Sequence, residues 1–212
     1  ATNEIVIAFL ADNKKTTEIN SNNWTEIMLS DKVRFARSDP NADPCGYRTL
    51  LLWKLAEKYY KKPQLFNKLS QKNLNFIRPK EVDLLALLES KSVDYIFIYR
   101  SVAIQHNLKF ISLPDNINLG NPQYENEYNN VNVEVKGKKP DENVTINGQS
   151  ILYGLTIPIK AKNNEAAEKF VNFILFGSKE ILKRNGQSPV ENIEKYINNE
   201  NSKIILNQSG TK

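Results

Sequence analysis

Short continuous apolar runs alternate along this chain with longer segments whose apolar residues recur three or four positions apart. The apolar runs, which are expected to form strands, cover residues 4–10, 33–36, 93–99 and 109–113. The first is rich in Ile and Val, as is typical of a strand buried on both faces. The helical periodicity covers residues 24–29, 44–60, 81–90 and 101–106. This alternation predicts an α/β fold with mostly parallel strands.

The second half of the chain is less regular. Residues 115–149 are rich in Asn, Gly and charged side chains, and we expect surface loops there with a hairpin near residues 131–135. Residues 151–158 predict one more strand. Residues 165–176 and 179–184 predict two helices, the second of which ends at Asn185 and Gly186.

Composition limits the class of protein. The chain has 212 residues, enough for one large domain or two small lobes with a real core. Its net charge is +5. The Lys and Arg residues are interspersed with Asp and Glu and form no dense basic block, which favours a lysine-rich solvated surface over a nucleic-acid-binding surface. No apolar run reaches the roughly 18 residues that a membrane span needs. Cys45 is the only cysteine, so an internal disulfide and a cysteine-based zinc site are excluded.

The most informative segment is the turn at residues 38–48, which reads SDPNADPCGYR. Asp43 followed by Pro44 predicts a helix cap and a proline at the first helical position. The unpaired backbone N–H groups of such a turn point outward at the positive end of the helix dipole, so the turn can hold an anion. The cap is itself an acid, however, and a carboxylate should repel an anion.

Two further residues are expected near the same edge of the sheet, where the carboxyl ends of strands meet the N-termini of helices. Glu81 is expected in the first turn of its helix, and Tyr99 ends an apolar strand. Ligands of open α/β sheets gather at the carboxyl ends of the strands. Several roles remain open at this point. Asp43 and Glu81 could be structural acids at helix starts, an acid/base pair or the ligands of a Mg²⁺ ion, and Tyr99 could be a packing residue. His106, the only histidine, follows an apolar helix on its polar side and is expected to have an ordinary structural or surface role. No glycine-rich nucleotide motif occurs.

A family resemblance then appears in ordered segments that span nearly the whole chain. They are residues 1–9, 38–48, 78–90, 94–106, 153–158 and 185–187. Together they resemble the archaeal-type tungstate/molybdate-binding proteins, which are the solute-binding components of ABC transporters. The resemblance implies a two-lobed fold of the type II periplasmic-binding-protein class, with the oxyanion held in a cleft between the lobes.

The resemblance also implies roles for individual residues. Asp43 and Glu81 match the two carboxylates that complete a six-fold coordination of the tungsten or molybdenum. Tyr99 matches a tyrosine that donates a hydrogen bond to the anion, and backbone N–H groups near Cys45 and Glu81 would be further donors. A carboxylate that ligates a hard metal centre no longer conflicts with anion binding. The same carboxylates would repel sulfate and phosphate, which cannot expand their coordination in this way.

The resemblance further suggests how the chain is organised. Residues 1–155 would form mainly the second, anion-binding lobe, and residues 156–212 would return to the first lobe as helices. The N-terminal part of the first lobe is expected to be missing from this chain, and the hinge crossings are expected near residues 1–4 and 153–156.

The function implied is that of an extracytoplasmic, monomeric binding protein that delivers its oxyanion to an ABC permease. No catalytic residue and no cofactor are expected, so the protein would not be an enzyme. Two alternatives stay open: a metal-dependent hydrolase that uses the Asp/Glu pair, and an oxyanion-sensing regulatory domain of the same fold.

Overall fold

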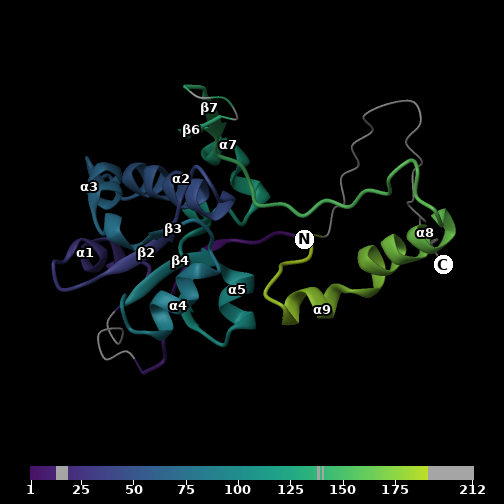
Figure 1. Cartoon of the computed structure of the whole chain (residues 1–212), viewed down its shortest axis with the longest axis horizontal. Coiled ribbons are helices and arrows are strands. Elements are labelled where there is room, and N and C mark those ends of the chain that lie inside the picture. The colour runs from purple at the N-terminus through teal and green to yellow at the C-terminus, as the bar shows by residue number, and fades with distance from the viewer. Residues whose placement is uncertain (13–18, 138, 140, 191–212) are drawn as a thin grey trace.

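A five-stranded sheet organises the structure, a computed structural model that describes residues 1–12, 19–137, 139 and 141–190 (Figure 1). Its strand order is β3-β2-β4-β1-β5. The strands are β1 (Ile5–Phe9), β2 (Phe35–Ser38), β3 (Ile77–Arg78), β4 (Tyr95–Tyr99) and β5 (Lys109–Ile111). Strand β2 pairs in parallel with β3 and β4, whereas β1 runs antiparallel to both β4 and β5. The expected α/β class is therefore confirmed. Four of the five strands run in one direction, as expected, but the reversed strand β1 lies between β4 and β5, so two of the four strand pairings are antiparallel.

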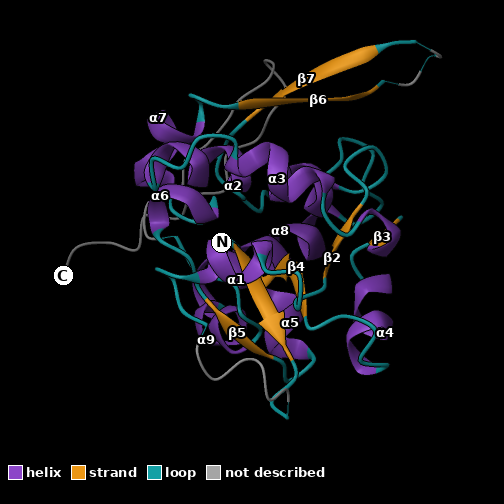
Figure 2. Cartoon of the chain, turned by 90° about the vertical axis from the view of Figure 1, so that its left-hand side faces the viewer, coloured by secondary structure: helices purple, strands orange, loops and turns teal. Residues whose placement is uncertain are grey.

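Helices cover both faces of this sheet (Figure 2). One face carries α1 (Trp24–Leu29), α2 (Pro44–Tyr59), α3 (Leu65–Gln71), α6 (Asp115–Asn118) and α7 (Glu125–Tyr128). The other face carries α4 (Asp83–Glu89) and α5 (Arg100–Gln105). Two short 3₁₀ turns, η1 (Leu74–Phe76) and η2 (Pro122–Tyr124), connect these elements. The result is a three-layer arrangement in which both faces of the central strands are buried.

The alternation of side chains along the strands builds the two cores. In β1, Ile5 and Ile7 belong to the core under α2, whereas Val6 and Ala8 belong to the core under α4 and α5. Under α2 the aromatic rings pack edge to face, with the Trp53 and Phe97 centroids 5.3 Å apart at 82°. These rings, together with Phe35 in β2, fix how α2 packs on the central strands.

The segment between residues 115 and 149 contains the hairpin that its pattern suggested. Strands β6 (Asn132–Lys136) and β7 (Asn143–Asn147) pair with each other in a separate antiparallel sheet. The hairpin extends beyond α2 and α3 (Figure 2). It contacts the turn before α2, since the backbone N–H of Lys136 donates to Asn41 Oδ1 at 2.9 Å.

The strand expected at residues 151–158 is wrong. Only Leu152 makes a bridge, to Thr2, and no residue between 153 and 158 belongs to a strand. This stretch leaves the sheet as an extended connection (Figure 1), so no neighbouring strand edge offers it a ladder of hydrogen bonds. An apolar run rich in β-branched residues is thus not enough to form a strand by itself.

The chain then forms α8 (Asn164–Asn172), a π-helical turn at Phe173–Gly177 and α9 (Lys179–Arg184). These elements lie apart from the sheet (Figure 1). Helix α9 ends where expected, with Gly186 in the left-handed region at φ +78°. The chain returns to the sheet immediately afterwards, because Thr2 and Ser188 exchange backbone hydrogen bonds of 2.7 and 3.0 Å.

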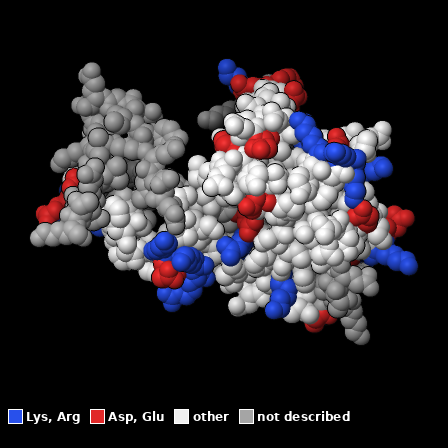
Figure 3. Space-filling model, turned by 180° about the vertical axis from the view of Figure 1, so that it is seen from behind, with Lys and Arg blue, Asp and Glu red and all other residues white. Residues whose placement is uncertain are grey.

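Charges of both signs are mixed on the rear face (Figure 3), as the interspersed sequence predicted. Within the described residues, none of the helices combines the length and apolar character needed to cross a membrane.

Candidate functional site

The predicted site residues follow three neighbouring parallel strands. Asp43 comes shortly after β2, Glu81 after β3, and Tyr99 is the last residue of β4. The backbone N–H of Asp39 donates to the Arg78 carbonyl at 2.7 Å and so keeps the loops after β2 and β3 together. Strand order β3-β2-β4 therefore brings these three residues to one edge of the sheet, where ligands bind in open α/β folds.

Asp43 is the N-cap of α2, as its sequence predicted. Its backbone is extended, and its Oδ1 accepts a hydrogen bond from the Cys45 N–H at 3.1 Å. Pro44 occupies the first helical turn, where its missing N–H costs nothing. Gly46, which sequence reasoning did not single out, is what allows the turn to fold back on the helix. A Cβ there would lie 2.6 Å from backbone atoms of residues 38–40.

The Asp43 carboxylate also joins the second loop. Its Oδ2 accepts a hydrogen bond from the Glu81 N–H at 2.7 Å. One buried carboxylate thus binds N–H groups from both the β2–α2 and the β3–α4 loops. The resemblance placed donors to an oxyanion near Cys45 and Glu81, and in this structure the Asp43 side chain accepts from the N–H groups at these two positions.

Glu81 lies in a turn and not in the first turn of a helix. Helix α4 begins at Asp83, and the preceding turn is closed by hydrogen bonds from Asp83 N to Lys80 O at 3.2 Å and from Leu84 N to Glu81 O at 3.1 Å. The expected helix start was therefore two residues too early. The turn leaves the Glu81 N–H free of the helix ladder, which is why it can donate to Asp43.

Burial and the neighbouring Asp43 carboxylate together raise the pKa of Glu81 to about 7, while the Arg48 guanidinium opposes this shift. Two carboxyl groups that share a partly buried site resist double ionisation. Around neutral pH Glu81 therefore retains a proton in part of the ligand-free molecules.

This raised pKa predicts a pH dependence of the stability of the ligand-free protein. Unfolding returns the Glu81 carboxyl toward its ordinary pKa of 4.5, so its contribution to stability is complete below pH 4.5 and is lost as the pH rises to about 7. Urea denaturation of wild type and Glu81→Gln at pH 5, 6, 7 and 8 measures this effect. As the pH rises, the urea midpoint of wild type should fall relative to the midpoint of Glu81→Gln. A constant difference between the two proteins across this range would contradict the raised pKa.

Tyr99 is paired with a cation that sequence reasoning missed. Its hydroxyl oxygen accepts a hydrogen bond from Arg48 Nη1 at 2.5 Å, and the Arg48 guanidinium lies 5.6 Å from the ring centroids of both Tyr47 and Tyr99. Burial raises the pKa of Tyr99, so the phenol stays protonated. The one available signal in the sequence was that Arg48 follows the Asp43 cap by little more than one helical turn.

The Cys45 side chain is enclosed in the core under α2. It is fully buried, its Sγ lies 3.8 Å from the Phe97 carbonyl oxygen in a weak hydrogen bond, and burial raises its thiol pKa well above the ordinary value. Any contribution of Cys45 to ligand binding is therefore expected from its backbone N–H and not from its sulfur.

No grouping of three or more His, Cys, Asp or Glu side chains suited to a metal ion occurs among the described residues. Asp43 and Glu81 thus form a pair without a third protein ligand there, and His106 lies exposed at the end of α5. A pair of carboxylates suits a hard metal centre whose remaining coordination positions are filled by oxygens of water or of the ligand itself.

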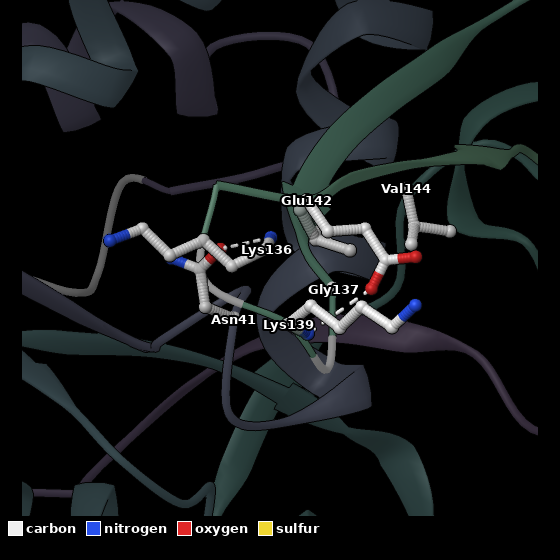
Figure 4. Close-up of a pocket in the computed structure, with 7 residues that line it drawn as sticks. Asn41, Lys136, Gly137, Lys139, Glu142 and Val144 are labelled. Carbon is white, nitrogen blue, oxygen red and sulfur yellow. Dashed lines mark hydrogen bonds between the residues drawn. The ribbon is translucent and has the colours of Figure 1, made fainter.

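A separate open hollow lies beside the β6–β7 hairpin (Figure 4). It is lined by Asn41, Val135, Lys136, Gly137, Lys139, Glu142 and Val144. Its Glu142 carboxylate accepts a hydrogen bond from the Lys139 N–H at 3.1 Å. None of the three residues predicted to contact a ligand through their side chains lines this hollow.

A sheet with one reversed strand and a site at the carboxyl ends of its parallel strands defines an α/β ligand-binding protein. Residues 1–186 match the family described as bacterial extracellular solute-binding protein. The chain belongs to this family.

Curated relatives agree with the family assignment. An uncharacterized solute-binding protein from Petrotoga mobilis is 46% identical over 205 residues, which cover 92% of this chain and 63% of that protein. The molybdate/tungstate-binding protein WtpA of Thermococcus kodakarensis is 43% identical over 200 residues, which cover 82% of this chain and 54% of WtpA. The chain thus spans little more than half to just under two thirds of the length of these relatives.

Solved structures confirm the fold. The periplasmic molybdate-binding protein of Azotobacter vinelandii aligns with a TM-score of 0.53 at 14% identity, covering 90% of this chain and 67% of that one. PEB3 with bound L-phospholactate aligns with a TM-score of 0.55 at 11% identity, covering 89% of this chain and 66% of PEB3. The predicted periplasmic-binding-protein class is therefore confirmed.

Proposed function

We propose that this chain is the anion-binding part of an extracytoplasmic solute-binding protein that captures tungstate or molybdate and delivers it to an ABC permease. The observation that carries the proposal is the Asp43 carboxylate, which bridges the N–H groups of Cys45 and Glu81 while the Glu81 carboxyl lies beside it. The WtpA relatives from Thermococcus kodakarensis and Pyrococcus abyssi, both described as molybdate/tungstate-binding, support this choice of ligand.

In the proposed complex, Asp43 and Glu81 ligate the metal of the oxyanion through their carboxylate oxygens. Hard, highly charged metal centres prefer such ligands. The two backbone N–H groups that Asp43 now occupies become donors to the anion, and the Tyr99 hydroxyl adds a third. The site performs no bond-breaking step, so the protein acts as a carrier and not as an enzyme, and it needs no cofactor.

The carboxylates also explain the proposed selectivity. Sulfate and phosphate match tungstate in being small oxyanions, but their central atoms do not accept two extra oxygen ligands. In contact with them, Asp43 and Glu81 would add only repulsion and would leave two charges uncompensated. Selectivity would thus result from the same two carboxylates, which stabilise bound tungstate or molybdate and repel sulfate and phosphate.

The division into lobes is part of the same proposal. Residues 1–155 would form mainly the second lobe, and residues 156–212 would return to the first, although residues 191–212 lie outside the described part of the chain. In support, α8 buries none of its residues, and Phe170, Phe173 and Phe176 are exposed. Thr2, Leu152 and Ser188 pair where the chain passes between the sheet and these helices, as a hinge requires.

Calorimetric titration of the full-length protein with tungstate, molybdate, sulfate and phosphate tests the proposal. We expect tight one-to-one binding of tungstate or molybdate and at least about a thousandfold weaker binding of sulfate, a difference of about 4 kcal/mol. Sulfate binding of equal strength would refute the metal-ligation mechanism. Absence of binding of both metal oxyanions would refute the proposed function.

A further inference from the structure

We propose that Arg48 is a positioning residue that orients the Tyr99 hydroxyl as a hydrogen-bond donor to the bound oxyanion and supplies positive charge to the site. This inference rests on the proposed function and deepens it. Neither the sequence pattern nor the family resemblance assigned a role to Arg48.

The hydrogen-bond chemistry fixes the direction of donation. A guanidinium can only donate, so the 2.5 Å contact between Arg48 Nη1 and Tyr99 Oη uses a lone pair of the tyrosine oxygen. The phenolic proton of Tyr99 then has to point to another acceptor. Among the described residues the Tyr99 hydroxyl donates no hydrogen bond, so the proton remains available to a ligand. Donation by a charged group also strengthens the outgoing hydrogen bond.

The surroundings of Arg48 keep it in this role. The guanidinium lies against the rings of Tyr47 and Tyr99, each centroid 5.6 Å away. Within the described residues no carboxylate lies inside 4 Å of it. Arg100 differs, because it pairs with Glu4 at 3.4 Å. The stacked and half-buried Arg48 therefore carries a charge that no ion pair in this part of the chain neutralises.

The charge balance of the proposed complex requires such a cation. A doubly charged oxyanion next to Asp43 and Glu81 brings four negative charges into one small region. Arg48 is close enough to attract the Glu81 carboxylate as well as to bond Tyr99. A fixed cation that is already desolvated and oriented offsets this repulsion without reorganisation on binding.

A double-mutant cycle of Arg48→Gln and Tyr99→Phe, read out as the tungstate Kd of the full-length protein, tests the inference. Arg48→Gln alone should weaken binding about 30-fold, as expected for loss of a charged hydrogen bond. In the Tyr99→Phe background the same change should weaken binding less than about fivefold, because the bond to the hydroxyl is already gone and only the loss of positive charge remains. Arg48→Lys, which keeps a charged donor, should restore part of the affinity. Arg34→Gln, an exposed arginine at the far end of β2, is the matched control and should leave the Kd unchanged.

Thermal melting checks that each variant is folded. Equal losses from Arg48→Gln with and without the Tyr99 hydroxyl would overturn the positioning role, since a merely structural effect is not coupled to one hydroxyl. An unchanged Kd for Arg48→Gln would overturn it as well. If wild type binds neither tungstate nor molybdate, it is the proposed function that fails, and with it the basis of this inference.

Discussion

Replacing Glu81 with Gln is expected to weaken tungstate binding more than about a hundredfold, which corresponds to about 2.7 kcal/mol. A neutral amide oxygen is a much poorer ligand for a hard metal centre than a carboxylate oxygen. The fold should survive, because the Glu81 side chain is half-buried, caps no helix and lies in a turn whose hydrogen bonds use only its backbone. The change also removes the repulsion between Glu81 and Asp43.

Calorimetry on wild type, Glu81→Gln and Glu89→Gln measures this effect. Glu89 is an exposed carboxylate at the end of α4, the helix that follows the Glu81 turn, so Glu89→Gln removes the same charge without touching the site. We expect the control to bind as wild type does. If Glu81→Gln retained full affinity with an unchanged melting curve, Glu81 would have to be removed from the ligand set.

Replacing Asp43 is expected to separate helix capping from ligand binding. Asp43→Ala leaves the N–H groups of Cys45 and Glu81 without their partner and should cost about 1–2 kcal/mol of stability from the lost cap alone. Asp43→Asn can still cap α2, because Asn is among the best capping residues, and should be destabilised less. Both variants should lose tungstate affinity more than about a hundredfold, since neither retains the ligating carboxylate.

Chemical denaturation and calorimetry on the same two variants distinguish the roles. A stable Asp43→Asn protein without tungstate affinity would establish that the acid is needed for the ligand and not only for the helix. If Asp43→Asn kept wild-type affinity, Asp43 would be a cap alone.

Asp43→Asn should also lower the pKa of Glu81, because it removes the neighbouring negative charge. The loss of stability of the ligand-free protein between pH 4.5 and 7 should therefore be smaller in this variant than in wild type.

Local signals in the chain predicted much of the α/β body. Asp43 and Pro44 specify the start of α2 because a capping side chain and a proline act within a single turn of backbone. The continuous apolar run at residues 93–99 predicted a strand, and β4 is indeed buried along its whole length, with side chains in both cores. The prediction at residues 151–158 failed because a strand needs a neighbour, and pairing is not encoded in the apolar run itself. The start of α4 was misplaced since residues 80–82 are held by turn hydrogen bonds that no strong capping residue announces.

The sequence by itself determined most of the elements, the helix cap and the family, because these depend on contacts within a few residues and on motifs that occur in order. It could name Asp43, Glu81 and Tyr99, but it could not show that they meet. Only the tertiary structure decided this, through the strand order β3-β2-β4, which places three distant loops at one edge. The same packing decided that the Asp43 carboxylate holds the N–H groups of two loops and that Arg48 reaches Tyr99. The Asp43–Glu81 and Arg48–Tyr99 contacts join residues 38 and 51 positions apart, and their energies depend on distance and burial that no local pattern encodes.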